Sequence, residues 1–212
     1  MNPGKSSNYK IDREKIFDRD ERKALLKTCK DRAELDALHG RETWIKRYML
    51  VDLALFTGLR VSEISALKVG DINLKAKDPY LIVRNGKGGK KRDVYLDKPL
   101  VRHLKEFISN KKKAWEESIE QDAPLFPGRN GKHCASITLM KSFKRAVQEA
   151  GLSEHYSIHC ARHTYATFLL HDTGNMKYVQ KQLGHSQIGM TAHYADILPE
   201  ENGNLANMIR RD

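Results

Sequence analysis

The middle of the chain reads YLIVRNGKGGKKRDVYL from Tyr80 to Leu96, and this stretch decides the fold class. Residues 80–83 and 93–96 are short runs rich in aromatic and aliphatic side chains, which are typical of strands. The residues between them are rich in glycine and lysine, so the two runs predict a β-hairpin. Residues 71–74 could add a third strand.

Apolar residues at helical spacing predict helices on both sides of this hairpin. The clearest pattern runs from about Thr43 to Phe56, and Gly58 ends it. Asp18 or Asp20 could cap an earlier helix. Further helices are expected at residues 61–67, 100–120, 136–150, 159–172, 176–183 and 187–194. The predicted fold class is therefore mainly α with a small antiparallel β-sheet, an α+β fold.

The length and charge of the chain narrow its class. Its 212 residues suit one domain, and 40% hydrophobic residues are enough for a core. Residues 1–18 are interpreted as a linker or disordered segment, and residues 19–212 as the domain, with a C-terminal tail from about residue 195. A formal net charge of +11 suits a polyanionic partner, nucleic acid first, but charge alone fits a soluble basic protein without such a partner equally well.

The sequence also gives an expectation for the cellular compartment of the protein. It contains no run of about 18 apolar residues that would predict a membrane span, and residues 1–10 lack the apolar stretch of a signal peptide. The three cysteines, Cys29, Cys134 and Cys160, are widely spaced, which fits a reducing cytosol better than a disulfide framework. We therefore expect a cytoplasmic protein with no membrane partner.

Two arginines are candidates for binding a phosphodiester. Arg60 lies in the segment TGLRVSE, residues 57–63, and Arg162 lies near the start of the helix predicted from His159. A guanidinium binds two phosphate oxygens and stays charged, and the N–H groups of a helix start add positive potential. Glu63 could hold Arg60 or a histidine in place. Alone, either arginine would more often form a surface salt bridge, so only the joint pattern indicates a site.

The predicted hairpin turn supplies a lysine. Lys87 lies between two glycines, and its ammonium could protonate the departing 5′ oxygen of a cleaved strand. Lys90 and Lys91 are rivals for this role, and the residues alone do not separate them. A solvated basic turn that contacts phosphates without specificity is the alternative.

Two histidines and a tyrosine complete the candidate set. His159 and His185 can donate a hydrogen bond to a phosphate oxygen or carry a proton near neutral pH. Tyr194 follows His185 by nine residues and is the candidate nucleophile. A free phenol has a pKa of about 10, so it needs nearby cations or a base to attack at neutral pH.

A zinc site is a competing interpretation of part of this set. His155, His159, Cys160 and His163 lie within nine residues, and two of the histidines have i,i+4 spacing. However, no HExxH pattern and no CxxC pair accompany them. We therefore expect no metal, and we expect His163 to pack against the helix or behind the site.

The candidate residues occur in an order and spacing that resembles a known family. The segments are Thr57–Glu63, Gly86–Lys90, His159–Arg162, Leu183–Ser186 and Tyr194. From about residue 20 to residue 200 they resemble the catalytic domain of tyrosine recombinases, the phage-integrase and Xer-like family. The resemblance implies the fold of that catalytic domain and favours Lys87 among the lysines. It also implies a set of activating residues and a nucleophile: Arg60, Lys87, His159, Arg162 and His185, with Tyr194.

The resemblance implies site-specific DNA recombination or integration. The tyrosine cleaves a strand to a 3′-phosphotyrosine and releases a 5′-hydroxyl, and another 5′-hydroxyl then reseals the DNA. The bond energy is retained, so no cofactor is expected. The implied partner is double-stranded DNA, with a monomer in isolation and a homotetramer on DNA. In this family, the C-terminal tail can pack on a neighbouring protomer.

Two features depart from the family pattern. Members usually carry a separate helical N-terminal core-binding domain, which this sequence does not show. The proline that usually precedes His-x-x-Arg is replaced by Ile158, which should shift the helix start only slightly. The alternatives are a catalytically idle DNA-binding remnant or regulator of the same fold, and relaxation of supercoils like that of a type IB topoisomerase.

Overall fold

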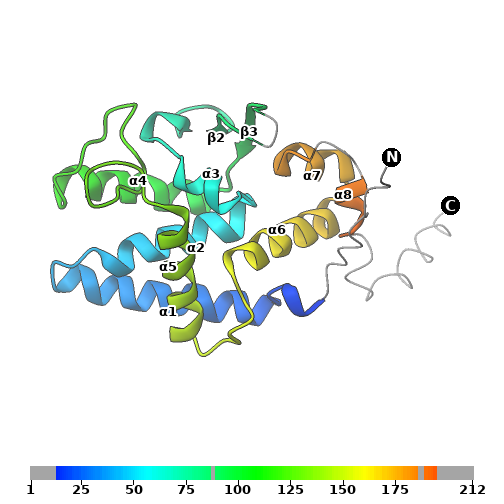
Figure 1. Ribbon diagram of the computed structural model, residues 1–212, viewed down its shortest axis with the longest axis horizontal. Coiled ribbons are helices and arrows are strands. Elements are labelled where there is room, and N and C mark those ends of the chain that lie inside the picture. Colours follow the sequence, from blue (N-terminus) through cyan, green and yellow to red (C-terminus); the bar gives the residue numbers. More distant parts are fainter. Residues whose placement is uncertain (1–12, 87–88, 186–188, 195–212) are drawn as a thin grey trace, which may run out of the picture.

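The computed structural model describes residues 13–86, 89–185 and 189–194, in which a small sheet lies at one edge of a group of helices (Figure 1). The helices are α1 (Arg19–Leu38), α2 (Thr43–Thr57), α3 (Val61–Ser65), α4 (Lys98–Lys113), α5 (Ser136–Glu149), α6 (Ile158–Thr173), α7 (Met176–Leu183) and α8 (Gly189–Ala192), with short 3₁₀ turns η1 (Arg13–Lys15) and η2 (Val69–Asp71). The strands are β1 (Ile72–Asn73), β2 (Tyr80–Val83) and β3 (Arg92–Tyr95). The predicted α+β class is confirmed.

The sheet is antiparallel throughout, in the order β1-β2-β3. Leu81 pairs with Val94, and Val83 pairs with Arg92, so these four side chains lie on one face. The three aliphatic members are buried, which places this face against the core. The predicted hairpin is confirmed, with β3 beginning one residue earlier than expected.

The helix ends follow the capping residues. Asp18 accepts a hydrogen bond from the Glu21 backbone N–H, and the Glu21 side chain accepts one from the Asp18 N–H, which forms a capping box before α1. Gly58 ends α2 in the left-handed conformation, with φ 62°. Gly184 ends α7 in the same way, with φ 65°. These glycines close the two helices that border the candidate site.

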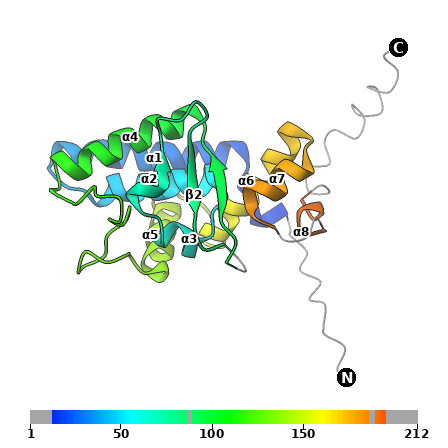
Figure 2. The ribbon, with the colours of Figure 1, turned by 90° about the horizontal axis from the view of Figure 1, so that it is seen from above.

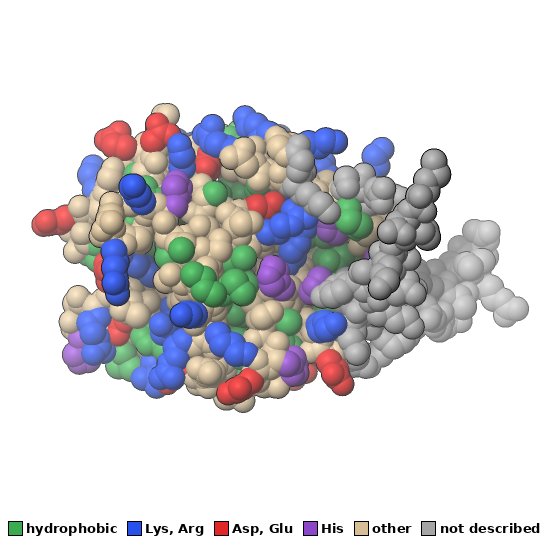
Figure 3. Space-filling model, in the orientation of Figure 1, with side chains coloured by type: hydrophobic (Ala, Val, Ile, Leu, Met, Phe, Trp, Pro, Cys, Tyr) green, Lys and Arg blue, Asp and Glu red, His purple; other side chains and the backbone are tan. Residues whose placement is uncertain are grey.

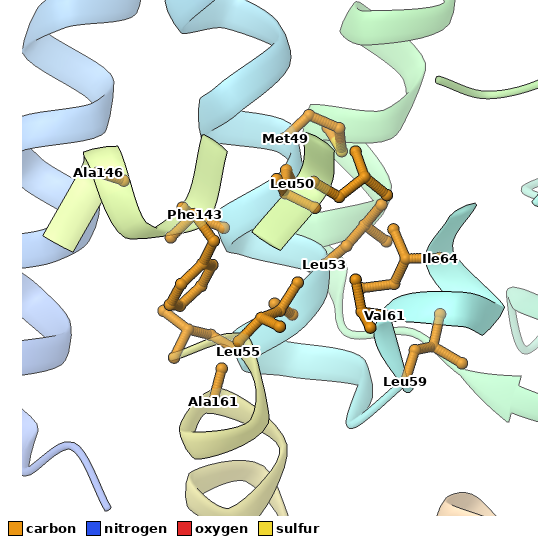
Figure 4. Packing of buried hydrophobic residues seen from close by; sticks show 14 of the residues in the cluster. Met49, Leu50, Leu53, Leu55, Leu59, Val61, Ile64, Phe143, Ala146 and Ala161 are labelled. Atoms are coloured by element: carbon orange, nitrogen blue, oxygen red, sulfur yellow. The ribbon is translucent and has the colours of Figure 1, made fainter. Parts of the chain in front are cut away.

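The core is centred on α2, which α1 borders along one side and α4, α5 and α6 elsewhere. Figure 4 shows part of it, labelling Met49, Leu50, Leu53, Leu55, Leu59, Val61, Ile64, Phe143, Ala146 and Ala161. All of these residues are buried. Full burial of a large apolar side chain stabilises a fold by about 1.5–3 kcal/mol. This packing therefore fixes the frame from which the site residues project.

A second, smaller apolar cluster joins α6 and α7 to the residues just after η1 and just after α8. Its buried members are Ile16, Ala166, Leu170, Val179, Leu183 and Tyr194. Seen from above, α7 and α8 lie at one end of the molecule, beyond α6 (Figure 2). Tyr194 is thereby anchored beside α6 and α7 rather than at the central core.

The N-terminal segment packs closely where it is described. Ile16 and Phe17 lie within the expected linker, yet both are buried. The Phe17 ring stacks on Tyr156 with centroids 4.0 Å apart, and the Phe17 N–H donates to Thr164 Oγ1 at 2.9 Å. The chain therefore contacts the body of the domain before α1 begins.

One predicted helix is too long. The pattern at residues 100–120 predicted a longer element, but α4 ends at Lys113. The chain then turns at Glu116, which has a positive φ of 52°, so that Glu117 contacts the last turn of α4. The buried Lys111 ammonium donates to Glu117 Oε2 at 2.5 Å, and the Glu117 N–H donates to the Lys111 carbonyl. These contacts join Glu117 to the last turn of α4, where the helix ends.

No helix within the described ranges has both the length and the apolar character needed to cross a bilayer. The expected C-terminal tail from about residue 195 lies outside the described residues.

Candidate active site

Arg162 lies where the C-terminal ends of two helices meet. Its Nη1 donates to the Gly58 carbonyl at the end of α2, and its Nη2 donates to the Leu183 carbonyl at the end of α7, at 2.9 Å. Carbonyls at a helix C-terminus carry partial negative charge and lack partners within the helix, so they suit a guanidinium. Arg162 is the fifth residue of α6, because this helix begins at Ile158. Arg162 therefore lies near the helix start, as expected, and backbone carbonyls hold its side chain.

Close packing at the end of α2 requires a glycine. A β-carbon added at Gly58 would lie 2.8 Å from Leu183 Cδ2, in addition to the strain of its positive φ. Only glycine allows the end of α2 to approach α7 this closely. The carbonyls of Gly58 and Leu183 thereby come within reach of one guanidinium.

Glu63 on α3 is the carboxylate at the centre of the site. It accepts a hydrogen bond from Arg60 Nη1 at 3.0 Å and one from the Arg60 backbone N–H at 2.8 Å. Arg162 Nη1 lies 4.0 Å from Glu63 Oε2. Burial alone raises the pKa of Glu63, but hydrogen bonds and charge from Arg92, with further help from Arg60 and Arg162, lower it below 4.5 overall. The expected contact of Glu63 with Arg60 is present.

Arg92 belongs to the same cluster, although the sequence did not single it out. Both of its terminal nitrogens donate to the Glu63 carboxylate at 2.9 Å, and its Nε donates to the Gln182 carbonyl at 2.9 Å. A bidentate pair of this kind fixes both orientation and charge. Arg92 could have been predicted from the strand register. It pairs with the buried Val83, so its side chain faces the protein interior, where an arginine needs a buried partner.

Arg92 passes close beside two glycine turns. A β-carbon at Gly184 would lie 2.9 Å from Arg92 Cδ, and one at Gly86 would lie 3.3 Å from Arg92 Nη1. Gly86 lies in the hairpin just before Lys87, and Gly184 lies just before His185. One side chain therefore packs against both segments that lead to candidate site residues.

His185 contacts Arg162 directly. Its Nε2 lies 3.2 Å from Arg162 Nη2, and its Nδ1 lies 3.0 Å from Thr191 Oγ1. Since the guanidinium can only donate, Nε2 of His185 accepts its hydrogen bond. The ring proton is then on Nδ1, which donates a hydrogen bond to Thr191 Oγ1. Burial, and then the charges of Arg162 and Arg60, lower the pKa of His185 to about 4. The ring is therefore neutral at pH 7 in the absence of DNA.

Tyr194 lies between two imidazoles. Its ring is nearly parallel to that of His185, at 12° with centroids 6.2 Å apart. Its hydroxyl lies 3.1 Å from His163 Nδ1. The tyrosine is only 4% exposed, so its environment is shaped by these side chains and the second apolar cluster.

Two expected site residues are not placed in this cluster. His159 is exposed at the start of α6, and among the described residues it shares no hydrogen bond with Arg162, His185 or Tyr194. Lys87 lies outside the described residues. Arg60, Glu63, Arg162, His185 and Tyr194 are the expected residues that the structure brings together.

The metal interpretation gains no support from the described part of the chain. No group of three or more histidine, cysteine or acidic side chains there has a geometry that could hold an ion. His155 instead contacts Ser153 through Nδ1 at 2.7 Å, and His163 contacts Tyr194.

Basic and imidazole side chains gather on the face drawn in Figure 3. Lys and Arg side chains and several histidines lie over the region where α3, α6 and α7 meet, which is the region of the site. Arg162 is charged at neutral pH, although burial and then the charge of Arg60 lower its pKa to about 10. The site can therefore bind an anion, and it holds a phenol next to neutral imidazoles.

Comparison with known proteins gives the class of this chain. Residues 15–201 match the phage integrase family, so the chain belongs to that family. It is 32% identical over 165 residues to the tyrosine recombinase XerC of Chlamydia trachomatis serovar L2, which covers 77% of this chain and 49% of that protein. It is 30% identical over 172 residues to a tyrosine recombinase of Thermosipho africanus, which covers 79% of this chain and 56% of that protein. The chain thus spans about half the length of these relatives.

Solved structures show the same fold. A crystal structure of XerA recombinase covers 100% of this chain and 68% of its own, with a TM-score of 0.73 and 22% identity. A post-cleavage complex of the XerH site-specific recombinase with a palindromic difH substrate covers 92% of this chain and 52% of its own, with a TM-score of 0.75 and 25% identity. The fold is therefore that of a tyrosine-recombinase catalytic domain.

Proposed function

We propose that this chain is the catalytic domain of a site-specific tyrosine recombinase, which cleaves and rejoins double-stranded DNA. The observation that carries the proposal is the meeting of Tyr194 with His185, and of His185 with Arg162, from separate segments of the chain. Related proteins named as recombinases, including one bound to a DNA substrate, support the same activity. The substrate is then a phosphodiester of duplex DNA.

In this proposal, the arginines prepare the phosphate for attack. Arg162 and Arg60 neutralise the non-bridging oxygens, where the transition state concentrates negative charge. Glu63 positions Arg60 through the contacts described above, and Arg92 positions Glu63. Because Arg162 is held by carbonyls before DNA binds, little reorganisation accompanies the reaction.

Tyr194 is the proposed nucleophile. Its oxygen attacks phosphorus to form a 3′-phosphotyrosine, and the bond to the 5′ oxygen breaks. Lys87 gives its proton to that oxygen, and His159 and His185 donate hydrogen bonds to the phosphate. His185 can donate from Nε2 once the negative charge of a phosphate raises its pKa above the value without DNA. Attack by a 5′-hydroxyl reverses the sequence, so no cofactor takes part.

The proposal extends to the assembly state and the domain limits, where the resemblance to the family supports it. We propose a monomer in isolation and a homotetramer on two DNA sites, with residues 19–212 as the catalytic domain and the segment from about residue 195 as the tail between protomers. Since the substrate is DNA, the proposed place of action is the cytoplasm. Light scattering with and without DNA would check the two assembly states.

Covalent trapping tests the proposed reaction. A randomised pool of nicked duplexes, each of which loses a short 5′-hydroxyl fragment on cleavage, is incubated with the protein and separated on a denaturing gel. The expected result is a protease-sensitive DNA adduct whose sequence, read after recovery, defines the site.

Matched tyrosine variants make the result specific. Tyr194→Phe should remove the adduct, whereas Tyr95→Phe, on the exposed face of β3, should keep it. An adduct that persists in Tyr194→Phe would overturn the assigned nucleophile. Salt-sensitive DNA binding without any adduct would instead favour a DNA-binding module with the same fold.

A further inference from the structure

The phenol of Tyr194 is hydrogen bonded to a histidine outside the expected set. His163 Nδ1 lies 3.1 Å from Tyr194 Oη, and the ring centroids are 5.9 Å apart. His163 follows Arg162 on α6, so it points to the neighbouring side of the same helix. A geometry within about 2.6–3.2 Å is what a general base requires of the group whose proton it takes.

The two other histidines are less suitable for this contact. Both ring nitrogens of His185 are already engaged, one with Arg162 and one with Thr191. His159 is exposed at the start of α6, four residues before His163. In the described structure, His163 is therefore the imidazole that is positioned on the reacting oxygen.

We propose that His163 accepts the Tyr194 proton during strand cleavage. This inference rests on the proposed recombinase function and deepens it. As the Oη–P bond forms, the phenolic proton passes to Nδ1 of the neutral ring, while the P–O5′ bond breaks and the 5′ oxygen takes a proton from Lys87. In the rejoining step, a 5′-hydroxyl gives its proton back to Lys87 and attacks phosphorus, the bond between Oη and phosphorus breaks, and His163 returns its proton to Oη.

The charges around His163 support a neutral ring that is ready to accept. Burial comes first, followed by electrostatic effects of Arg162, His159 and Lys15, and together they lower the pKa of His163 to about 4. These groups lie on α6 and η1, and His185 and Tyr194 face the ring from the other side. A bound phosphodiester adds negative charge to this surrounding, which raises the basicity of the ring when substrate is present.

The test uses single-turnover cleavage of the DNA site recovered by trapping. His163→Gln keeps a hydrogen-bonding side chain but cannot take a proton, and His163→Ala removes the side chain. We expect both to slow adduct formation by about 10²–10⁴-fold at pH 7, the usual range for a lost general base. His155→Gln, an exposed histidine that contacts Ser153, is the matched control and should cleave at the wild-type rate.

Three readouts separate proton acceptance from a structural role. The deficit of His163→Gln should shrink as pH rises towards the phenol pKa of about 10, where the phenolate forms without a base. Added imidazole should partly restore His163→Ala. A substrate with sulfur in place of the bridging 5′ oxygen, a better leaving group, should rescue Lys87→Ala but not His163→Gln.

The outcomes distinguish this inference from the function on which it rests. A wild-type protein that forms no adduct overturns the recombinase proposal and this inference together. A wild-type adduct with His163→Gln equally fast, or with a deficit that does not change with pH, overturns the role of His163 alone. Thermal unfolding of each variant shows whether it is folded at the assay temperature. If His163→Ala is not folded, the test relies on His163→Gln.

Discussion

The apolar core around α2 and the arginine cluster around Glu63 are both largely buried, but they are held in opposite ways. Leu53 and Phe143 are fully buried and touch many interchangeable aliphatic neighbours. Glu63 is 6% exposed and faces three guanidinium groups, each in a defined direction. Apolar contacts tolerate small shifts, whereas a buried charge is stable only with its partners in place. The core should therefore govern stability, and the cluster should govern both stability and activity.

The largest expected effect on stability is in the core. Phe143→Ala should lower the free energy of unfolding by about 3–5 kcal/mol, because it removes a buried ring and leaves a cavity. Urea unfolding measures the change. Ile137→Ala on the same helix, where the side chain is 57% exposed, should change stability by less than about 0.5 kcal/mol. Protein that remains folded should cleave DNA as the wild type does.

Glu63→Gln should have a slightly smaller effect on stability and a much larger one on activity. Removing the carboxylate charge leaves the buried Arg92 and Arg162 without their counter-ion, which should cost about 3 kcal/mol. Glu34→Gln makes the same chemical change in an exposed pair with Lys30 and should be nearly neutral. Unfolding and adduct formation are measured on the same samples. Full activity in Glu63→Gln would show that the arginines keep their positions without it.

A third prediction compares two glycines that end helices. Gly184→Ala should cost about 2 kcal/mol and Gly174→Ala about 1 kcal/mol, although both have positive φ. A β-carbon at Gly174 meets nothing within 4 Å, whereas one at Gly184 meets the Arg92 side chain. Thermal unfolding of the pair isolates the contribution of that contact. Equal costs would mean that Arg92 does not constrain the turn before His185.

The last prediction concerns the dependence of stability on pH. The pKa values of His163 and His185 fall from 6.5 to about 4 on folding, so the unfolded chain binds more protons between these values. Stability should therefore decrease as pH falls from about 6.5 through 4. Folding also lowers the pKa of Glu63 from its ordinary value of 4.5, so protonation of this carboxylate adds a further loss of stability below pH 4.5. Melting temperatures of His163→Gln combined with His185→Gln should depend less on pH. The exposed His155→Gln should leave the pH dependence unchanged.

Local patterns were sufficient to predict most of the fold. Periodic apolar residues predicted α2 and α7, a terminal glycine marked the end of α2, and a glycine-rich segment between two β-prone runs predicted the hairpin. Burial of Ile16 and Phe17 could not be predicted in this way. Their partners include Thr164, which is 147 residues from Phe17 in the sequence.

Site residues that belong to a sequence motif could be predicted, whereas those that depend on tertiary contacts could not. Arg60, Arg162, His185 and Tyr194 belong to segments with a recognisable order. Arg92 is the last of three consecutive basic residues, which is also what a solvated turn would show. Its buried position depends on the strand register, which the basic run does not reveal. The contact between His163 and Tyr194 depends on where the residues after α8 lie against α6, which helical spacing does not reveal.

The position of Arg92 makes the hairpin unsuitable as an exchangeable module. Its side chain packs against the turns at Gly86 and Gly184 and binds Glu63 and the Gln182 carbonyl. A hairpin transplanted from a related protein would be accommodated only if its strand brings an arginine to this register. The acceptor would also have to keep a glycine at the end of α7 and a carboxylate on α3. Chimeras of such proteins should therefore exchange these three segments together.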